Sequence, residues 1–245
     1  VWLPKAHPVA PSPASALLSG ILTKVGIYGI LMTSITAMYG NIGFGTLVLV
    51  LGVITMVLGA VLGVFSINLK RTLACSSMSQ IGFILIGIAM TLILQGVDHE
   101  EGIVMALSGA MLHMLNHSLI KLVLFMAAGV VVMNLETLIL DEIRGWGRNK
   151  TLLKIAFGLG ALGISGVPLF NGYISKTLLH EGIVEGMHAC APLHGMLSIV
   201  EWVFLFSGGL TFDYMLKLFI CIFVEKNREE KLQRKYDANS RRMNA

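Results

Sequence analysis

The stretch IVMALSGAMLHMLNHSLIKLVLFMAAGVVVM, residues 103–133, is apolar almost throughout, and its ionisable side chains are those of His113, His117 and Lys121. A membrane-spanning α-helix needs about 20 predominantly apolar residues to cross a hydrocarbon core roughly 30 Å thick. Because this stretch exceeds that length, it predicts a transmembrane helix. Ionisable groups inside such a helix are costly, and each one is by default a functional hypothesis.

The composition of the whole chain agrees with a membrane protein. Of the 245 residues, 55% are hydrophobic and 13% are charged, and the mean hydropathy is +0.78. Soluble domains carry about 25% charged residues. We therefore predict an all-α polytopic membrane protein with about six transmembrane helices in residues 1–224, followed by a basic cytoplasmic tail at 225–245. The expected spans are 14–39, 44–67, 72–95, 103–133, 151–180 and 196–224.

Lys and Arg gather on one side of the expected membrane. Of the 18 basic residues, 14 lie before the first span, between the second and third, between the fourth and fifth, or after the sixth. The opposite loops, 40–43, 96–102 and 181–195, contain none. The positive-inside rule therefore predicts that both termini are cytoplasmic. We interpret the basic tail as a topology signal at the lipid surface, and we predict no nucleic-acid partner.

The other four basic residues fall inside expected spans. Lys24 lies roughly 15 Å from the start of its span, near the midplane of the membrane. Placing a lysine there costs at least about 2.5 kcal/mol, so we interpret Lys24 as a functional residue. Lys217 has Asp213 four residues before it on the same helix face, so we interpret these two residues as a structural pair.

His113, His117 and Lys121 follow one another at intervals of four and should share one helix face. Three readings of this ladder remain open. The first is a proton relay, since imidazole and a buried lysine can both exchange protons near neutral pH. The second is a zinc site, although the ammonium group of Lys121 stands where a further ligand is needed. The third is a structural ladder that is hydrogen-bonded to Asn116 and Ser118.

The sequence GISGVPLFNGYISK, residues 163–176, predicts an interrupted helix. Gly166, Pro168 and Gly172 should break the backbone hydrogen bonding at membrane depth. Such breaks are tolerated only where protein or water covers them. Lys176 follows the break by about two turns, so we expect it to lie beside a hydrated cavity.

Lys24, the ladder and Lys176 thus predict a polar line at mid-depth of the membrane. Sodium and calcium prefer oxygen ligands, whereas this line offers ammonium and imidazole groups, so the proton is the expected cargo. The sequence has no CxxC, no GxGxxG that opens a helix and no haem motif. Its three cysteines are far apart. We therefore predict neither a metal site nor a cofactor, and we assign any electron chemistry to partner proteins.

Five motifs resemble the antiporter-like, proton-pumping membrane subunits shared by respiratory complex I, Mrp antiporters and energy-converting hydrogenases. They are WLPKAHPVAPSPASALLSGILTKVGIYGI (2–30), INLKRTLACSSMSQIGFILIG (67–87), the HxxxHxxxK of 113–121, GVPLFNGYISK (166–176) and LTFDYMLKLF (210–219). The first of them looks closer to formate hydrogenlyase and related hydrogenase subunits than to the Mrp type.

The resemblance implies residue roles and a fold. Lys24 looks like the central lysine of the family's eighth helix, the ladder looks like the relay of its eleventh helix, and Lys176 looks like the lysine of its broken twelfth helix. The family fold contains two inverted five-helix repeats, and this chain would form helices eight to thirteen, most of the second repeat. The family's glutamate on the fifth helix and lysine on the seventh are absent from this sequence, so the chain alone is not expected to pump.

The resemblance also implies partners and a location. We expect other membrane subunits, a peripheral redox arm, and the inner membrane of a prokaryote. The leading hypothesis is proton translocation in a redox-driven complex. A cation/proton antiporter subunit of the Mrp type is one alternative, and a non-conducting scaffold or truncated copy is another.

Overall fold

The computed structural model describes residues 2–233 and residue 236. Within these residues all named elements are helical, and the strand-like pairing is an isolated bridge between Asn68 and Ile139. The prediction of an all-α membrane protein is therefore confirmed. The elements are α1 (Leu3–Val9), α2 (Ser12–Leu17), the π-helix η1 (Leu18–Leu22), α3 (Thr23–Thr36), α4 (Ile42–Phe65), α5 (Leu69–Gln95), α6 (Glu100–Leu135), α7 (Leu140–Ile143), α8 (Thr151–Ser165), α9 (Asn171–Ala189), the 3-10 helix η2 (Ala191–Leu193) and α10 (His194–Phe223).

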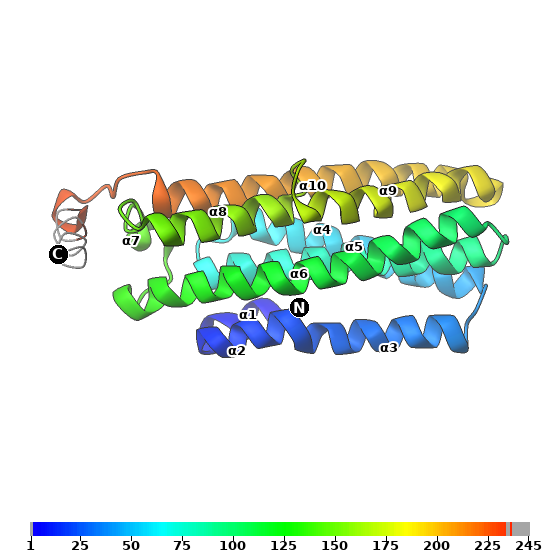
Figure 1. The fold of residues 1–245 in the computed structure, drawn as a ribbon, viewed down its shortest axis with the longest axis horizontal. Helices are drawn as coiled ribbons and strands as arrows, with labels where there is room; N and C mark the ends of the chain where they lie inside the picture. The colour runs from blue at the N-terminus through cyan, green and yellow to red at the C-terminus, as the bar shows by residue number, and fades with distance from the viewer. Residues whose placement is uncertain (1, 234–235, 237–245) are drawn as a thin grey trace.

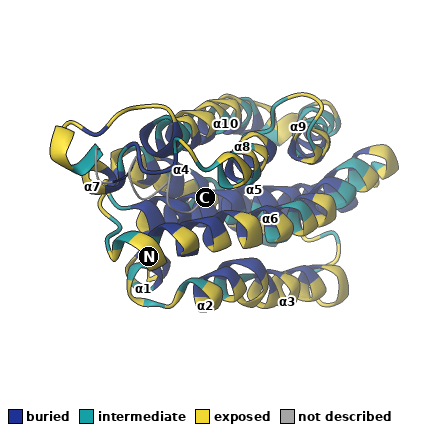
Figure 2. Ribbon diagram, turned by 60° about the vertical axis from the view of Figure 1, so that its left-hand side comes forward, coloured by how far each residue is buried: buried dark blue, intermediate teal, exposed yellow. Residues whose placement is uncertain are grey.

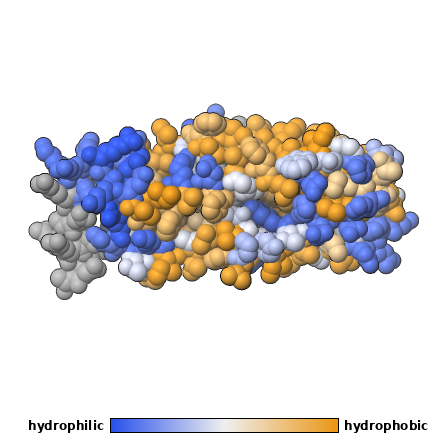
Figure 3. Space-filling model, turned by 90° about the horizontal axis from the view of Figure 1, so that it is seen from above, coloured by the Kyte–Doolittle hydropathy of each residue, from blue (hydrophilic) through white to orange (hydrophobic). Residues whose placement is uncertain are grey.

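The long helices run side by side along the long axis of the molecule (Figure 1). The α1–α3 segment lies on one side, α4, α5 and α6 occupy the middle, and α8, α9 and α10 lie on the other side. Among the described residues, five stretches are long and apolar enough to cross a membrane: Ser12–Thr36, Ile42–Phe65, Leu69–Gln95, Glu100–Leu135 and Ala191–Phe223. The surface is mostly hydrophobic along the middle of the bundle and hydrophilic at both ends (Figure 3).

The two ends of the bundle differ in charge. We call one end the basic end, because it holds Lys70, Arg71 and the α6–α8 connection with Arg144 and Arg148. The other end holds the α3–α4, α5–α6 and α9–α10 connections, which contain no Lys or Arg. We call it the acidic end, since Asp98 lies in its α5–α6 connection and Glu100 and Glu101 begin α6.

Helix α5 lies at the centre of the bundle and is buried over most of its length (Figure 2). Its closest neighbour is α4, and small residues on both helices make the close approach possible. A Cβ atom at Gly59 would lie 2.3 Å from the backbone nitrogen of Ser79, and one at Gly82 would lie 2.4 Å from that of Met56. Any larger residue would push the helices apart, which is the usual reason for glycine between packed membrane helices.

The expected span at 151–180 is divided into α8 and α9. Residues 166–170 connect them and project from the bundle about halfway along it (Figure 1). Gly166 and Leu169 adopt positive φ angles of 79° and 77°, and Pro168 lies between them. The third residue expected in the break, Gly172, instead lies in the first turn of α9. A Cβ atom there would come within 1.8 Å of the carbonyl oxygen of Gly163, so this position needs glycine for packing.

The first expected span contains a feature that periodicity does not predict. A π-helical turn, η1, joins α2 to α3, and single π-turns inside α-helices are frequent at functional sites. Before this turn, Trp2 lines a pocket with Thr23 and Met78, and α1 leads from there toward the basic end.

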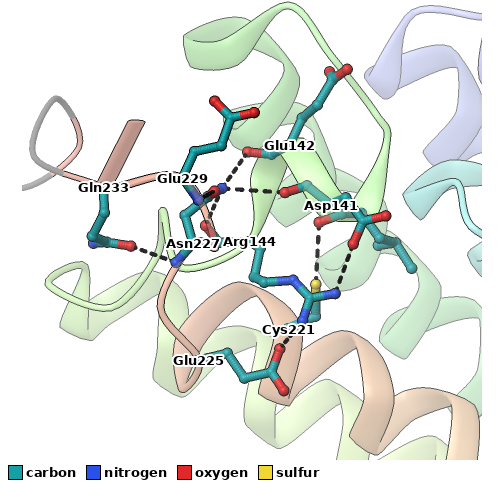
Figure 4. Close-up of polar contacts among 9 residues, drawn as sticks. Asp141, Glu142, Arg144, Cys221, Glu225, Asn227, Glu229 and Gln233 are labelled. Atoms are coloured by element: carbon teal, nitrogen blue, oxygen red, sulfur yellow. Dashed lines mark hydrogen bonds and ion pairs between the residues drawn. The ribbon is translucent and has the colours of Figure 1, made fainter. Parts of the chain in front are cut away.

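The described part of the C-terminal segment docks on the loop between α6 and α8 (Figure 4). The Nδ2 atom of Asn227 donates to the backbone oxygens of Asp141, Glu142 and Arg144 at 3.2–3.3 Å. Arg144 in turn pairs with Asp141 at 2.8 Å and with Glu225 at 2.6 Å. The basic tail predicted at 225–245 thus begins as a docked segment, while Arg234, Lys235, Arg241 and Arg242 lie outside the described residues.

Candidate functional site

Lys24 and His117 meet in the interior of the bundle. Lys24 is the second residue of α3 and 8% exposed, and His117 lies on α6 and is 1% exposed. The Lys24 Nζ atom lies 2.6 Å from His117 Nδ1 and donates to the carbonyl oxygen of Ser19 at 2.6 Å. Ser19 belongs to the π-helical turn, which therefore helps to position the lysine. The Lys24–His117 contact joins two bases, so a proton on either nitrogen can serve the hydrogen bond.

His113 connects three helices. Its Nε2 atom lies 3.0 Å from Oε1 of Gln80 on α5, and its Nδ1 atom lies 2.9 Å from Oγ of Ser175 on α9. Gln80 extends the chain of contacts, since its Nε2 atom donates to Oγ1 of Thr211 on α10 at 3.3 Å. Both ring nitrogens of His113 are thus bonded to side chains of other helices, and Ser175 is adjacent in sequence to Lys176.

Lys121 is fully buried at 0% exposure. Its ammonium group donates to the Leu73 carbonyl oxygen at 2.8 Å and to the Ser76 hydroxyl, both on α5. In residues 2–233 and 236, no carboxylate forms an ion pair with Lys24 or Lys121. Their ammonium groups are therefore stabilised, within this part of the chain, by neutral hydrogen-bond acceptors alone.

The ladder residues share the buried face of α6, but their hydrogen bonds lead to different helices. No hydrogen bond among the described residues joins His113 to His117 or His117 to Lys121. Asn116 contacts Asn171 and Ser175, and Ser118 contacts the carbonyl oxygens of Gly20 and Met114. The contacts that the structural reading expected between the ladder and these two side chains are therefore absent from the described region.

Lys176 lies on α9 just after the break. Its Nζ atom donates to the carbonyl oxygen of Ser165 at 3.3 Å and lies 4.9 Å from the ring centre of Phe83. It lines a cavity of about 310 Å³ together with His180. Because the Ser165 carbonyl is freed by the end of α8, the break itself supplies a hydrogen-bond partner for the lysine.

The pairing that we expected between Asp213 and Lys217 is not formed: no ion pair joins these two described residues. Lys217 instead donates to the carbonyl oxygens of Val64 at 2.6 Å and Ser66 at 2.9 Å, at the end of α4. The last carbonyl groups of a helix lack backbone partners and attract cations. Lys217 therefore caps α4, which is still a structural role.

Sequence analysis missed several residues of this site. Gln80, Ser175 and Thr211 are ordinary polar residues in apolar helices, and only tertiary contacts reveal their link to His113. Tyr214 is 0% exposed, and its hydroxyl group lacks a hydrogen-bond partner among the described residues. His7 is also fully buried and stacks on the ring of Phe125 at 4.6 Å. In the sequence, His7 is marked only by its position next to a proline before the first expected span, and this pattern does not by itself indicate a functional residue.

The described residues contain no group of three or more His, Cys, Asp or Glu side chains that could hold a metal ion. The two histidines of the HxxxH pattern also bond in different directions, one to Gln80 and Ser175 and the other to Lys24. This arrangement does not favour the zinc reading.

The chain is similar to known proteins in sequence and in fold. The chain is 32% identical over 222 residues to hydrogenase-4 component B of Escherichia coli, which covers 89% of this chain and 33% of that protein. It is 37% identical over 185 residues to an NAD(P)H-quinone oxidoreductase chain 4 of Picosynechococcus, covering 75% of this chain and 32% of the relative. The chain thus spans about a third of the length of these relatives.

A solved structure of the Mrp complex from Dietzia contains a chain with the same arrangement of helices. The TM-score is 0.76 at 26% identity, over 92% of this chain and 39% of that one. In addition, residues 1–201 match the family model described as NADH:quinone oxidoreductase/Mrp antiporter, TM. The predicted resemblance is confirmed, and the chain belongs to this family of antiporter-like membrane subunits.

Proposed function

We propose that this chain translocates protons as part of a redox-driven membrane complex, through a line formed by Lys24, His117, Lys121, His113 and Lys176. The observation that carries the proposal is the Lys24–His117 contact, a 2.6 Å hydrogen bond between two buried bases. Such a pair is expensive to bury for stability alone. A pair of buried bases can, however, bind a proton within the membrane and release it to the next group.

The contacts connect the line to the neighbouring helices. His117 on α6 meets Lys24 of α3, and Lys121 bonds to α5. His113 leads through Ser175 to α9, the helix that carries Lys176. The remaining gaps between these groups are the steps at which a change of charge in a neighbouring subunit can control transfer.

Partner subunits are part of the proposal. The relatives named above belong to complexes or oxidoreductases. In this chain, Leu169 in the break between α8 and α9 is fully exposed. Irregular backbone at membrane depth does not face lipid, so we infer that another protein segment covers this break. We also propose that the basic end faces the cytoplasm of a prokaryotic cell and that the electron chemistry belongs to other subunits.

A cation/proton antiporter is the second candidate, because the Mrp complex contains a chain of similar structure. Inverted membrane vesicles that carry the complete complex can distinguish the two functions. Redox-driven translocation predicts proton uptake that starts on addition of the electron donor and does not need sodium. Proton flux that depends on a sodium gradient, without any donor, would favour the antiporter and contradict the proposal.

A further inference from the structure

The cavity beside Lys176 contains a second titratable side chain, that of His180, and His180 is bonded to Glu201. We propose that His180 and Glu201 form the exit for protons from Lys176 to the acidic end of the bundle. This inference rests on the proposed function, and it adds two proton-transfer residues to the line.

The position of His180 on α9 fits this role. His180 follows Lys176 by four residues, so the two side chains project from the same helix face about 6 Å apart along the axis. Both line the cavity of about 310 Å³, together with Phe83, Phe204 and Gly208. A water molecule occupies about 30 Å³ in the liquid, so the space is large enough for several waters between the two groups.

The direction of transfer follows from the helices. Moving from Lys176 to His180 leads away from the break and toward the end of α9 at Ala189, which lies at the acidic end. Glu201 lies in the first half of α10, which begins at that same end. The His180 and Glu201 side chains are partly exposed, at 27% and 24%, whereas Lys24 and Lys121 are buried.

The hydrogen bond orients the imidazole for transfer. His180 Nε2 lies 3.0 Å from Oε1 of Glu201, so a neutral His180 donates its Nε2 proton to the carboxylate and leaves Nδ1 as the acceptor. A proton leaves the Lys176 ammonium, crosses the cavity on water and binds Nδ1. The imidazolium then releases its Nε2 proton to Glu201, and the carboxylic acid gives that proton to solvent at the acidic end.

A purely structural role explains the pair less well. Partly exposed ion pairs contribute little to stability. The pair instead joins the Lys176 cavity to α10, because His180 lines that cavity and bonds to Glu201.

Two adjacent glycines on α10 allow the cavity to be tested without touching a titratable group. An added Cβ atom at Gly208 or at Gly209 would meet no atom within 4 Å, but only Gly208 lines the cavity. In vesicles with the complete complex, we expect Gly208→Leu to reduce donor-driven proton uptake by about 10-fold or more, the scale of a lost proton-transfer step. Gly209→Leu should retain the wild-type rate. Equal rates in the two variants would contradict an exit through this cavity.

Chemical rescue tests His180 itself. We expect His180→Ala to lose uptake to a similar extent and added imidazole, which can enter the enlarged cavity, to restore it. His188→Ala is the matched control, since His188 is exposed on the same helix, and it should neither lose uptake nor respond to imidazole. A His180→Ala variant that assembles and pumps normally would overturn the proposal, as would a loss of uptake that imidazole fails to restore.

Lys176→Ala distinguishes a failure of the proposed exit from a failure of the proposed function. If Lys176→Ala stops uptake while Gly208→Leu and His180→Ala do not affect it, the proposed function stands and the exit lies elsewhere. If Lys176→Ala also pumps at the wild-type rate, the proposed function itself fails.

Discussion

Nζ of Lys24 lies 2.6 Å from Nδ1 of His117, and the two side chains come from helices that are far apart in the sequence. Neither group has an ion-pair partner among the described residues. The contact brings the first expected span directly to the ladder of α6. Lys24 and His117 therefore form one hydrogen-bonded unit.

This contact predicts strong coupling between its two members. Lys24→Ala and His117→Ala should each reduce donor-driven proton uptake by about 10-fold or more, because each removes a step of proton transfer. The double variant should be no slower than the slower single variant, since groups that act as one unit are not additive. Uptake rates of the four proteins at matched assembly measure the coupling. Independent, multiplying losses would show that the two residues act separately.

Gln80 should affect stability and proton uptake through its hydrogen bond to His113. Gln80→Leu keeps a similar volume but leaves Nε2 of His113 without its 3.0 Å partner. We expect a loss of about 1–3 kcal/mol in stability, the cost of an unsatisfied buried polar group, together with slower proton uptake. Thr91→Val on the same helix is the control, because among the described residues the Thr91 hydroxyl bonds to a backbone oxygen of its own helix, that of Gly87. If both variants behave alike in the uptake assay, Gln80 has no special link to the relay.

The close packing of Gly172 in the first turn of α9 predicts that a larger residue there destabilises the bundle. Gly172→Ala would place a Cβ atom 1.8 Å from the carbonyl oxygen of Gly163, so α8 and α9 must move apart. We expect a loss of about 1–3 kcal/mol, as for overpacked cores, seen as a lower melting temperature in detergent. Gly26→Ala on α3 has open space around the new Cβ atom and should cause no loss. An unchanged melting temperature for Gly172→Ala would contradict the observed contact between the two helices.

The docked C-terminal segment predicts a local effect at the basic end. Asn227→Ala removes the donor to three backbone oxygens of the α6–α8 loop (Figure 4). We expect trypsin to cut faster at Lys226, Arg228 and Lys231, because the segment opens more often once these bonds are lost. Lys154→Ala, on α8 and away from the Asn227 contacts, should leave the rate of cleavage at these sites unchanged. Equal cleavage in wild type and Asn227→Ala would mean that these bonds do not hold the segment in place.

Sequence patterns predicted the parts of this structure that depend on local rules. Hydrophobic length predicted the membrane helices, the spacing of four predicted a shared face for His113, His117 and Lys121, and Gly166 with Pro168 predicted the break. Each of these features follows from helix geometry within a few turns of the residues concerned.

Contacts between distant segments could not be predicted in the same way. The partners of His113 are 33 and 62 residues away, and nothing in the sequence selects Gln80 or Ser175 over other polar residues. Lys217 was expected to bind the nearest carboxylate on its own helix, but backbone oxygens at the end of α4 lie within reach and replace it. The π-helical turn at Leu18–Leu22 likewise has no signature in a hydrophobic pattern.

The most direct test of the central claim is donor-driven proton uptake in inverted vesicles that carry the complete complex, with wild type, Lys121→Arg and Lys121→Ala compared at matched assembly. Arginine keeps the positive charge but stays protonated, so a relay predicts that both variants lose most of the uptake. Uptake at the wild-type rate in either variant would contradict the relay and leave the ladder of α6 with a structural role.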